Sequence, residues 1–391
     1  MAMISQIIYP CLVNPFSNLP LYSFPSILAG AILKNLTFAT HTRLKVLWHY
    51  VLGWTLSFLF LSIVRGVGTE ELGSLQFGFG ESIRLSLTLG PMIGLISGTA
   101  QLLIEEKWYR RVSVLRYLLL RTLFGLTFLG FLVLVAYWTY RLFFGTEIGL
   151  YLFAFDRGSG AIYFYVLMTD LAMSVLREIN LMLGEGNLGK MITGKFYHPR
   201  EEERIFMFLD LQSSTTLAEQ LGHLKYSHLI QDCFNDLGVV AEDAAEIYQY
   251  VGDEAVLTWP YLTGIKNTNV LNAYFRFARQ LASRAGYYEQ RYGVLPFFKA
   301  GIHGGQVTVT QIGKYKKEIA YHGDPINTAA RIQAQCNVLG AALLISAPLA
   351  KAMPSDTYHL ECVGSLQLKG KQTEVEVYAV HQATSAVKKN A

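Results

Sequence analysis

The pattern of apolar and polar positions changes near residue 183. Before that point four long apolar stretches run over Val46–Val64, Ile83–Ile104, Tyr117–Phe144 and Gly160–Leu183. Each approaches the roughly 20 residues that an α-helix needs to cross a bilayer. The pattern therefore predicts a transmembrane domain of about four helices over residues 46–183, preceded by a cytoplasmic lead-in over residues 1–45.

After residue 183 the apolar runs are shorter and alternate between strand-like and helix-like spacing. A Gly-rich, charged connector over 184–203 leads into a globular domain over 204–380, and a tail covers 381–391. Ile205–Leu211 reads as a buried strand, and Leu217–Ala245 has the spacing of one or two helices. Ile247–Pro260 predicts a β-hairpin with Gly252-Asp253 at its tip.

The remainder of the domain repeats this alternation. In order it predicts a helix over Asn267–Tyr292, two strands joined at Gly304-Gly305 within Phe297–Ile312, a helix from about Pro325, a strand near Leu343–Ser346, and two strands across Leu366–Val380. The order β-α-β-β-α-β is that of a ferredoxin-like α+β fold. The predicted architecture is thus a helical membrane domain followed by an α+β domain.

Composition and charge agree with this division. Hydrophobic residues make up 52% of the chain and charged residues only 16%, which is too apolar for an ordinary soluble protein. A net charge of +4 without a basic stripe argues against nucleic acid as a partner. Basic residues precede the first span and fill the loop after the second: Lys34, Arg43, Lys45, Lys107, Arg110, Arg111 and Arg116. The positive-inside tendency then predicts a multi-pass protein of the cell inner or plasma membrane with both termini cytoplasmic.

Charged residues within the fourth span need partners, because an unpaired charge in lipid costs a few kcal/mol. Asp170 and Arg177 lie seven residues apart in or near the end of this span. We expect Asp170 to pair with Arg121 or Arg141 of the third span, as a structural contact. A sensing role for these groups stays open.

Two aspartates of the globular domain suggest a metal site. Asp210 ends the first strand and Asp253 sits at the hairpin tip, so the two carboxylates are expected on adjacent strands. Magnesium takes one or two protein carboxylates and completes its shell with phosphate and water oxygens. The segment that follows, including Ser213, Ser214 and Thr215, would open a helix whose N–H groups face phosphate oxygens.

Two further motifs follow the segments around Asp210 and Asp253: "GDPINTAARIQ" over Gly323–Gln333 and "LQLKGK" over Leu366–Lys371. From about Glu201 to Val380 the chain resembles the catalytic domain of class III nucleotidyl cyclases, which convert nucleoside triphosphates to cyclic nucleotides. In that family two domains pair head to tail. The resemblance implies two Mg²⁺ or Mn²⁺ ions per site held by Asp210 and Asp253 of one subunit.

The other subunit in this family supplies an Asn, an Arg and a Lys, which match Asn327, Arg331 and Lys369. Asn327 would orient the ribose, Arg331 would stabilise the α-phosphate in the transition state, and Lys369 would contact the terminal phosphates. Because one chain carries both half-sets, a homodimer with two equivalent sites is implied. A nucleoside triphosphate is the implied substrate.

The base-reading positions depart from the family pattern. Adenylyl cyclases usually carry Lys and Asp or Thr there and guanylyl cyclases Glu and Cys, whereas this chain has Gln249 and Ala320. An amide can face either purine, and a methyl group cannot hydrogen-bond. We favour an adenylate cyclase acting on ATP. The alternatives are a guanylate cyclase acting on GTP and a non-catalytic membrane receptor that binds nucleotide.

Overall fold

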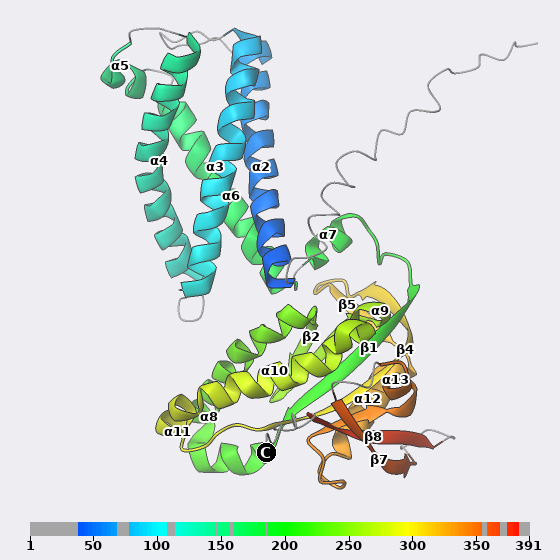
Figure 1. Cartoon of the computed structure of the whole chain (residues 1–391). Coiled ribbons are helices and arrows are strands. Elements are labelled where there is room, and N and C mark those ends of the chain that lie inside the picture. The colour runs from blue at the N-terminus through cyan, green and yellow to red at the C-terminus, as the bar shows by residue number, and fades with distance from the viewer. Residues whose placement is uncertain are drawn as a thin grey trace, which may run out of the picture.

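The chain folds into a helical bundle and a separate α/β module, joined through the short helix α7 (Asn187–Ile192) (Figure 1). The computed structural model describes residues 38–68, 78–107, 114–144, 148–156, 159–184, 186–353, 358–367 and 374–382. The buried clusters of the α/β module contain no residue of the bundle. Each module therefore has a hydrophobic core of its own.

The bundle contains the four predicted apolar helices and one short extra helix. They are α2 (Phe38–Gly68), α3 (Phe79–Lys107), α4 (Val114–Phe144), α5 (Leu150–Ala154) and α6 (Ser159–Met182). By length and composition four of them can span a membrane: Arg43–Arg65, Phe79–Glu105, Leu115–Leu142 and Ser159–Met182. The predicted spans are therefore confirmed as candidate membrane helices.

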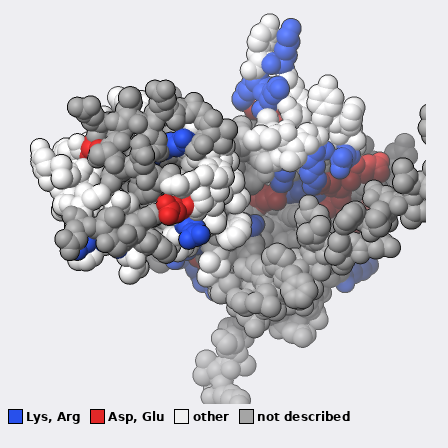
Figure 2. Space-filling model, turned by 90° about the horizontal axis from the view of Figure 1, so that it is seen from above, with Lys and Arg blue, Asp and Glu red and all other residues white. Residues whose placement is uncertain are grey.

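Large apolar side chains point outward from the bundle. Trp138 is 65% exposed and Leu142 82% exposed, values that would be unfavourable in water but suit a hydrocarbon surround. In the view of Figure 2 the described part of the bundle is largely uncharged, whereas acidic and basic side chains gather on the other module. The bundle surface thus has the chemistry of a membrane-embedded domain.

Helices α2 and α3 pack closely because α3 carries glycine at every fourth position. A Cβ at Gly94 would lie 2.4 Å from Val51 Cα, and one at Gly90 would lie 2.7 Å from Thr55 Cα. Gly98 continues the same stripe against Tyr50. Small residues at this spacing let helix backbones approach where no hydrophobic force drives association.

The charges inside the bundle are paired. Arg121 donates from Nη2 to Asp170 Oδ1 at 2.7 Å and from Nε to Asp170 Oδ2 at 2.9 Å, and Ser97 donates to Asp170 at 2.7 Å. The predicted pairing of Asp170 with the third span is confirmed, and the partner is Arg121. Arg177 forms a bidentate pair with Glu105 of α3 at 2.9 and 3.0 Å. These contacts tie α3, α4 and α6 together across the core.

The α/β module is built on an eight-stranded sheet in the order β2-β3-β1-β4-β6-β8-β7, with β5 paired to β4. The strands are β1 (Arg200–Leu211), β2 (Glu246–Val251), β3 (Glu254–Pro260), β4 (Phe298–Ile312), β5 (Glu318–His322), β6 (Leu343–Ser346), β7 (Tyr358–Leu366) and β8 (Val375–Gln382). Each of the strands β2, β3, β1 and β4 runs antiparallel to its neighbour in the sheet. This four-strand core has the predicted ferredoxin-like order.

Helices cover both faces of β1, because successive side chains of a strand point to opposite faces. On one face Ile205, Met207 and Leu209 pack in the main core cluster. That face is covered chiefly by α8 (Ser214–Leu237), η2 (Gly238–Asp243), α10 (Asn269–Ser283) and α11 (Ala285–Tyr292). On the other face Phe206 and Phe208 pack with Ala329 of α12 (Asp324–Ala334). Shorter helices connect the remaining strands: α9 (Tyr261–Ile265), η3 (Lys266–Thr268) and α13 (Ala347–Lys351).

The segment that connects the modules packs against the α12 face. Phe196 is 3% exposed and joins the cluster of Phe206 and Phe208. Arg204, also 3% exposed, donates to Glu246 of β2 at 2.6 Å and to Thr258 of β3 at 3.0 Å. The first strand is therefore anchored to its neighbours at the end nearer the bundle.

The structure differs from the predicted elements in four places. Residues 298–312 form one continuous strand with no turn at Gly304-Gly305; a Cβ there would meet Tyr261 at 3.0 Å and Pro325 at 2.9 Å, so the glycines serve close packing. Strand β5 was not predicted. The closing pair begins earlier than expected, with β7 at Tyr358–Leu366. The single helix expected over residues 267–292 is divided near Arg284 into α10 and α11.

Candidate active site

The two predicted metal ligands lie together at one end of the sheet. Asp210, one residue before the end of β1, is the register partner of Glu254 in β3. Asp253 precedes Glu254 in the tight turn between β2 and β3, where Gly252 takes a φ of 63°, a conformation that favours glycine. The two carboxyls are close enough for the charge of Asp253 to act on Asp210. Local strand geometry thus creates the acidic pair.

The electrostatics of this pair are unfavourable without a cation. Burial, and next the charge of Asp253, raise the pKa of Asp210 above its ordinary value. Gln333 of α12 donates from Nε2 to Asp210 Oδ2 at 3.2 Å and partly offsets this. Asp253 Oδ2 is buried and has no hydrogen-bond partner among the described residues. A buried carboxylate oxygen without a donor costs free energy.

A third carboxylate, missed by the sequence reasoning, adds to the repulsion. Glu254 lies directly across from Asp210, and like charges directly opposite each other destabilise a strand pair. Burial, followed by the charges of Asp210 and Asp253, raises the pKa of Glu254 to about 7. The sequence carries a signal for Glu254. This residue belongs to the predicted hairpin, and the hairpin was expected to pair with the strand that ends in Asp210.

The residues present fit a divalent cation. Carboxylate oxygens are the ligands that Mg²⁺ prefers, and Mg²⁺ usually retains water and substrate phosphate in its shell. Within the described ranges no group of three or more His, Cys, Asp or Glu is arranged to hold a metal. Among the described residues the pair Asp210 and Asp253 supplies two carboxylates, and an ion there would complete its shell with further oxygen ligands such as water and substrate phosphate.

The start of α8 lies beside the acidic pair. Ser213, at the N-cap, has a φ of 58° and makes no side-chain cap, and the helix begins at Ser214. The first-turn N–H groups of a helix have no intrahelical acceptor. Tyr226 lies near this helix start, where burial, followed by the charge of Asp253, raises the pKa of its phenol. Tyr226, like Glu254 and Gln333, is thus a neighbour of the site that sequence reasoning missed.

Helix α12 is seated on β4 through a glycine. A Cβ at Gly301 would lie 2.1 Å from Gln333 N and 2.7 Å from Ala329 O, so only glycine permits this approach. Gly323, before the first residue of the helix, has a φ of 153° and a ψ of 168°, an extended region that is essentially restricted to glycine. Two glycines therefore set the position and the start of α12.

The predicted catalytic pair lies on the opposite side of α12 from the sheet. Thr328, Ala329 and Ile332 are buried, whereas Asn327 is exposed and Arg331 partly exposed. These two positions are four apart and share one helical face. In the part of the chain that the structure describes, Arg331 has no hydrogen-bond or ion-pair partner. Within one chain, the structure does not bring this pair onto Asp210 and Asp253.

The base-reading positions come from β2 and β5. Gln249 is exposed, and Ala320 is 7% exposed and pairs with Thr310 of β4. Their neighbours Tyr248 and Tyr321 touch, with ring centroids 4.9 Å apart in an edge-to-face arrangement. The structure therefore brings these two strands together. Lys369 lies outside the described residues.

Comparison with known proteins now defines the class of this module. The family model described as the adenylate and guanylate cyclase catalytic domain matches residues 196–382. The α/β module therefore belongs to the family of class III cyclase catalytic domains. The sheet, the acidic pair and α12 all lie within the matched residues.

A curated relative and a solved structure are similar to this chain. Adenylate cyclase 2 of Rhizobium meliloti (strain 1021) is 32% identical over 218 residues, which cover 55% of this chain and 60% of that protein. The chain thus spans less than two thirds of that relative. A bacterial light-regulated adenylyl cyclase has a similar fold, with a TM-score of 0.50 and 19% identity over 59% of this chain and 68% of that chain.

Proposed function

We propose that this protein is an integral-membrane adenylate cyclase that converts ATP to 3′,5′-cyclic AMP and pyrophosphate at a homodimer interface. The observation that carries the proposal is the division of the site within one chain. Asp210 and Asp253 form a half-buried acidic pair, and the buried Oδ2 of Asp253 has no hydrogen-bond partner among the described residues. Asn327 and Arg331 face away from the sheet that carries this pair. A second copy is the source of the missing half of each site.

The reaction is attack of the ribose 3′-oxygen on the α-phosphorus. The new O–P bond forms as the bond from the α-phosphorus to the bridging oxygen breaks, and pyrophosphate leaves with the electron pair. The hydroxyl proton passes to water. Divalent ions, when bound, supply neutralisation of phosphate charge and lower the pKa of the attacking hydroxyl. Asp210 and Asp253 are the residues that would hold them.

The chain's other residues position and stabilise the substrate. Arg331, with no partner of its own in the described chain, would bond the α-phosphate oxygens as their charge grows. Asn327 would orient the ribose, and the N–H groups of Ser214 and Thr215 would bind phosphate oxygens. Lys369 would contact the terminal phosphates.

The preference for ATP is supported by the adenylate cyclase of Rhizobium meliloti, at 32% identity. The family itself includes both adenylate and guanylate cyclases. Gln249 offers an amide that can face either base, and Ala320 offers no hydrogen bond. We therefore expect ATP to be preferred with modest discrimination, since strong rejection requires buried polar groups that the wrong base leaves unpaired.

The membrane setting is part of the proposal. Four candidate spans lie before the catalytic module, and the basic loops favour cytoplasmic termini. The module would then meet cytosolic ATP, while the bundle reports conditions in the membrane or beyond it. The protein would act as a homodimer in the cell inner or plasma membrane.

One assay tests substrate and activity together. Full-length protein in lipid nanodiscs is given Mn²⁺ with ATP or GTP, and the product is identified by mass. We expect cyclic AMP as the main product. Cyclic GMP as the main product would make it a guanylate cyclase, and no cyclic product from either nucleotide would support the receptor reading. Gln249→Glu combined with Ala320→Cys should shift turnover toward GTP.

A further inference from the structure

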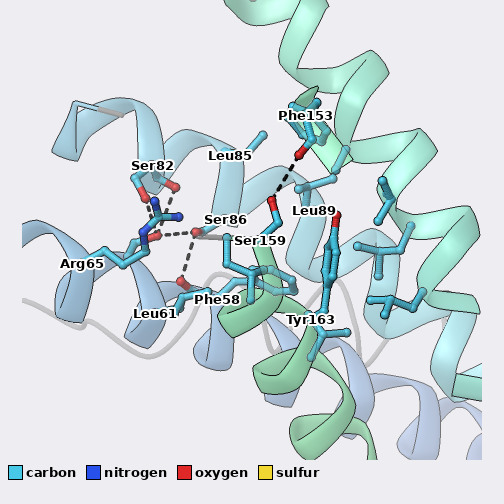
Figure 3. A pocket seen from close by; sticks show the side chains of 17 residues that line it. Phe58, Leu61, Arg65, Ser82, Leu85, Ser86, Leu89, Phe153, Ser159 and Tyr163 are labelled. Carbon is cyan, nitrogen blue, oxygen red and sulfur yellow. Dashed lines mark hydrogen bonds between the residues drawn. The ribbon is translucent and has the colours of Figure 1, made fainter. Parts of the chain in front are cut away.

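Polar contacts at the two ends of the bundle lead to different partners. At the end away from the α/β module, Figure 3 shows Ser82 and Ser86, and both are hydrogen-bonded to Ser62, at 2.9 and 2.6 Å. At the other end the connecting segment carries Lys190 of α7, whose Nζ lies 3.8 Å from Oε1 of Glu246 in β2. The first set of contacts stays within the bundle, whereas the second reaches β2, an edge strand of the sheet.

Arg204 of β1 joins this edge strand to β5. It donates from Nη2 to Glu246 Oε2 at 2.6 Å, and its guanidinium carbon lies 5.0 Å from the centre of the Tyr321 ring of β5. A cation is attracted to the face of an aromatic ring, most strongly where both are removed from water. Arg204 is buried and Tyr321 half-buried. One guanidinium therefore holds two strands that are not neighbours in the sheet.

Tyr321 extends this link across the α12 face of the sheet. Its ring centroid lies 5.4 Å from that of Phe206 in β1 and 4.9 Å from that of Tyr248 in β2, and both pairs are edge-to-face. Such aromatic pairs are favourable beyond the area that they bury. All three rings pack in the cluster that contains Ala329 of α12. The ring of Tyr248 is therefore held from the side of β5.

Tyr248 lies at an irregularity of β2. In the register with β3, Ile247 pairs with Leu257 and Gln249 pairs with Val256, so Tyr248 is an extra residue. A bulge of this kind re-aims side chains, and it commonly lies next to an active site. Ile247 packs against the main core cluster, whereas Tyr248 and Val256 belong to the α12 face. Because paired residues share a face, the bulge puts Tyr248 and the exposed Gln249 on the same side.

We propose that Arg204 and Tyr321 are positioning residues for recognition of the nucleotide base. They hold Tyr248 in place, and the Tyr248 ring fixes the bulge that carries the Gln249 amide. This role rests on the proposed function, in which Gln249 faces the purine, and it adds the residues that set where the amide stands. Neither Arg204 nor Tyr321 needs to touch the base, since each acts through Tyr248.

The arrangement separates base recognition from the chemical step. Asp210 lies six residues beyond Arg204 in β1, which corresponds to about 20 Å along a strand. Loss of the contacts of Arg204 or Tyr321 should therefore weaken binding of the base and leave the acidic pair in place. A change that weakens ground-state and transition-state binding equally raises KM with little effect on kcat.

Nucleotides that cannot cyclise measure this binding directly. 3′-Deoxy-ATP and 3′-deoxy-GTP lack the attacking hydroxyl, and their dissociation constants are measured for full-length protein in nanodiscs with Mn²⁺. In Tyr321→Leu we expect the affinity for 3′-deoxy-ATP to fall by at least about fivefold and the preference over 3′-deoxy-GTP to shrink, because an amide without a fixed position discriminates poorly. Tyr321→Phe keeps the ring and should bind both nucleotides as the unmodified protein does.

Turnover distinguishes positioning from a general loss of structure. In Tyr321→Leu the KM for ATP should rise by the same factor, while kcat changes by less than about twofold. Tyr358→Leu is the matched control, because Tyr358 is buried in β7 at the opposite edge of the sheet and stacks on Phe275 with ring centroids 5.1 Å apart. It should lower stability without changing nucleotide affinity. An equal loss of affinity in Tyr358→Leu would overturn the positioning role.

Arg204→Lys is a second variant, which decides if Tyr321→Leu does not fold. Lysine keeps the charge but lacks the planar fork that bonds Glu246 and Thr258 together, so affinity for 3′-deoxy-ATP should fall by about twofold or more. Unchanged affinity in the variants that fold would overturn the positioning role alone and leave the proposed reaction intact. Absence of nucleotide binding and of cyclic product in the unmodified protein would contradict the proposed function and this role with it.

Discussion

Asp253 is held at a hairpin tip with one buried carboxylate oxygen that faces no donor in the described chain. A divalent ion shared with Asp210 would remove both the unsatisfied oxygen and the repulsion between the two carboxyls. In the proposed site the same atoms would be unfavourable without the ion and would take part in catalysis with it. Site residues of this kind commonly break rules that the rest of the fold obeys.

Replacing Asp253 with Asn keeps the shape of the side chain and removes its charge. We expect cyclic AMP formation at saturating ATP to fall by at least about 100-fold, because a direct charge contact in a catalytic site is typically worth several kcal/mol. The midpoint temperature of thermal unfolding should be unchanged or slightly raised in the absence of divalent ions. Glu219→Gln, at an exposed position of α8, is the control. Near-normal turnover in Asp253→Asn would exclude it as a metal ligand.

The raised pKa of Glu254, about 7 against an ordinary 4.5, predicts a pH dependence of stability. Without divalent ions the folded module binds a proton here more tightly than the unfolded chain does. This contribution to stability is present below about pH 4.5 and is lost as the pH rises through 7.

The change that tests this dependence is Glu254→Gln. Because Glu254 is half-buried and screened by solvent, we expect a gain in unfolding free energy of about 1 kcal/mol at pH 8 and little gain at pH 5. Urea unfolding of the purified residues 196–391 in EDTA measures the difference. A gain of equal size at both pH values would contradict the electrostatic cause.

At the scale of elements, α12 depends on the absence of a side chain at Gly301 in β4. Gly301→Ala would place a Cβ 2.1 Å from Gln333 N, so the helix must move away from the sheet. Overpacking of this kind typically costs about 1–3 kcal/mol. We expect urea unfolding to show a loss of unfolding free energy of about 1–3 kcal/mol or more. Cyclase activity should also fall, because Asn327 and Arg331 move with the helix.

Gly286 of α11 provides a matched control, since a Cβ there meets nothing within 4 Å. Gly286→Ala should stabilise the module by up to about 1 kcal/mol, because alanine is the better helix former. If Gly301→Ala were as harmless as Gly286→Ala, the close seating of α12 would be wrong.

The elements most accessible to sequence reasoning were those with strong local signals. The apolar length of the spans, the buried run at Ile205–Leu211 and the Gly252-Asp253 turn each specify their structure locally. The turn predicted at Gly304-Gly305 was wrong. Glycine favours turns, but it also occurs in strands that pack closely against bulky neighbours. Here Tyr261 and Pro325 occupy the space that a Cβ would need, a contact that only the tertiary fold reveals.

The candidate site shows the same difference between local sequence signals and contacts that depend on the tertiary fold. Asp210 and Asp253 could be placed together because a strand end and a hairpin tip meet in this fold. Gln333 and Tyr226 could not, since each reaches the site from a helix whose position is set by packing far along the chain. Glycines 90, 94 and 98 of α3 carried a readable small-residue spacing that the sequence reasoning did not use.

At the scale of the whole molecule, each module has its own core, and the chain between them packs on the α12 face through Phe196. A conformational change in the bundle could therefore reach α12, which carries Asn327 and Arg331, without passing through the acidic pair. This arrangement fits a protein in which a membrane domain adjusts how two catalytic modules meet.

The central claim is that each site takes its carboxylates from one protomer and its amide and guanidinium from the other. Co-expression of Asp253→Ala and Arg331→Ala chains, each inactive alone, tests it directly. With random pairing, half of the dimers are mixed and contain one intact site, so we predict recovery of roughly a quarter of the wild-type rate. No recovery, with mixed dimers confirmed by affinity tags, would show that each site is built within one chain.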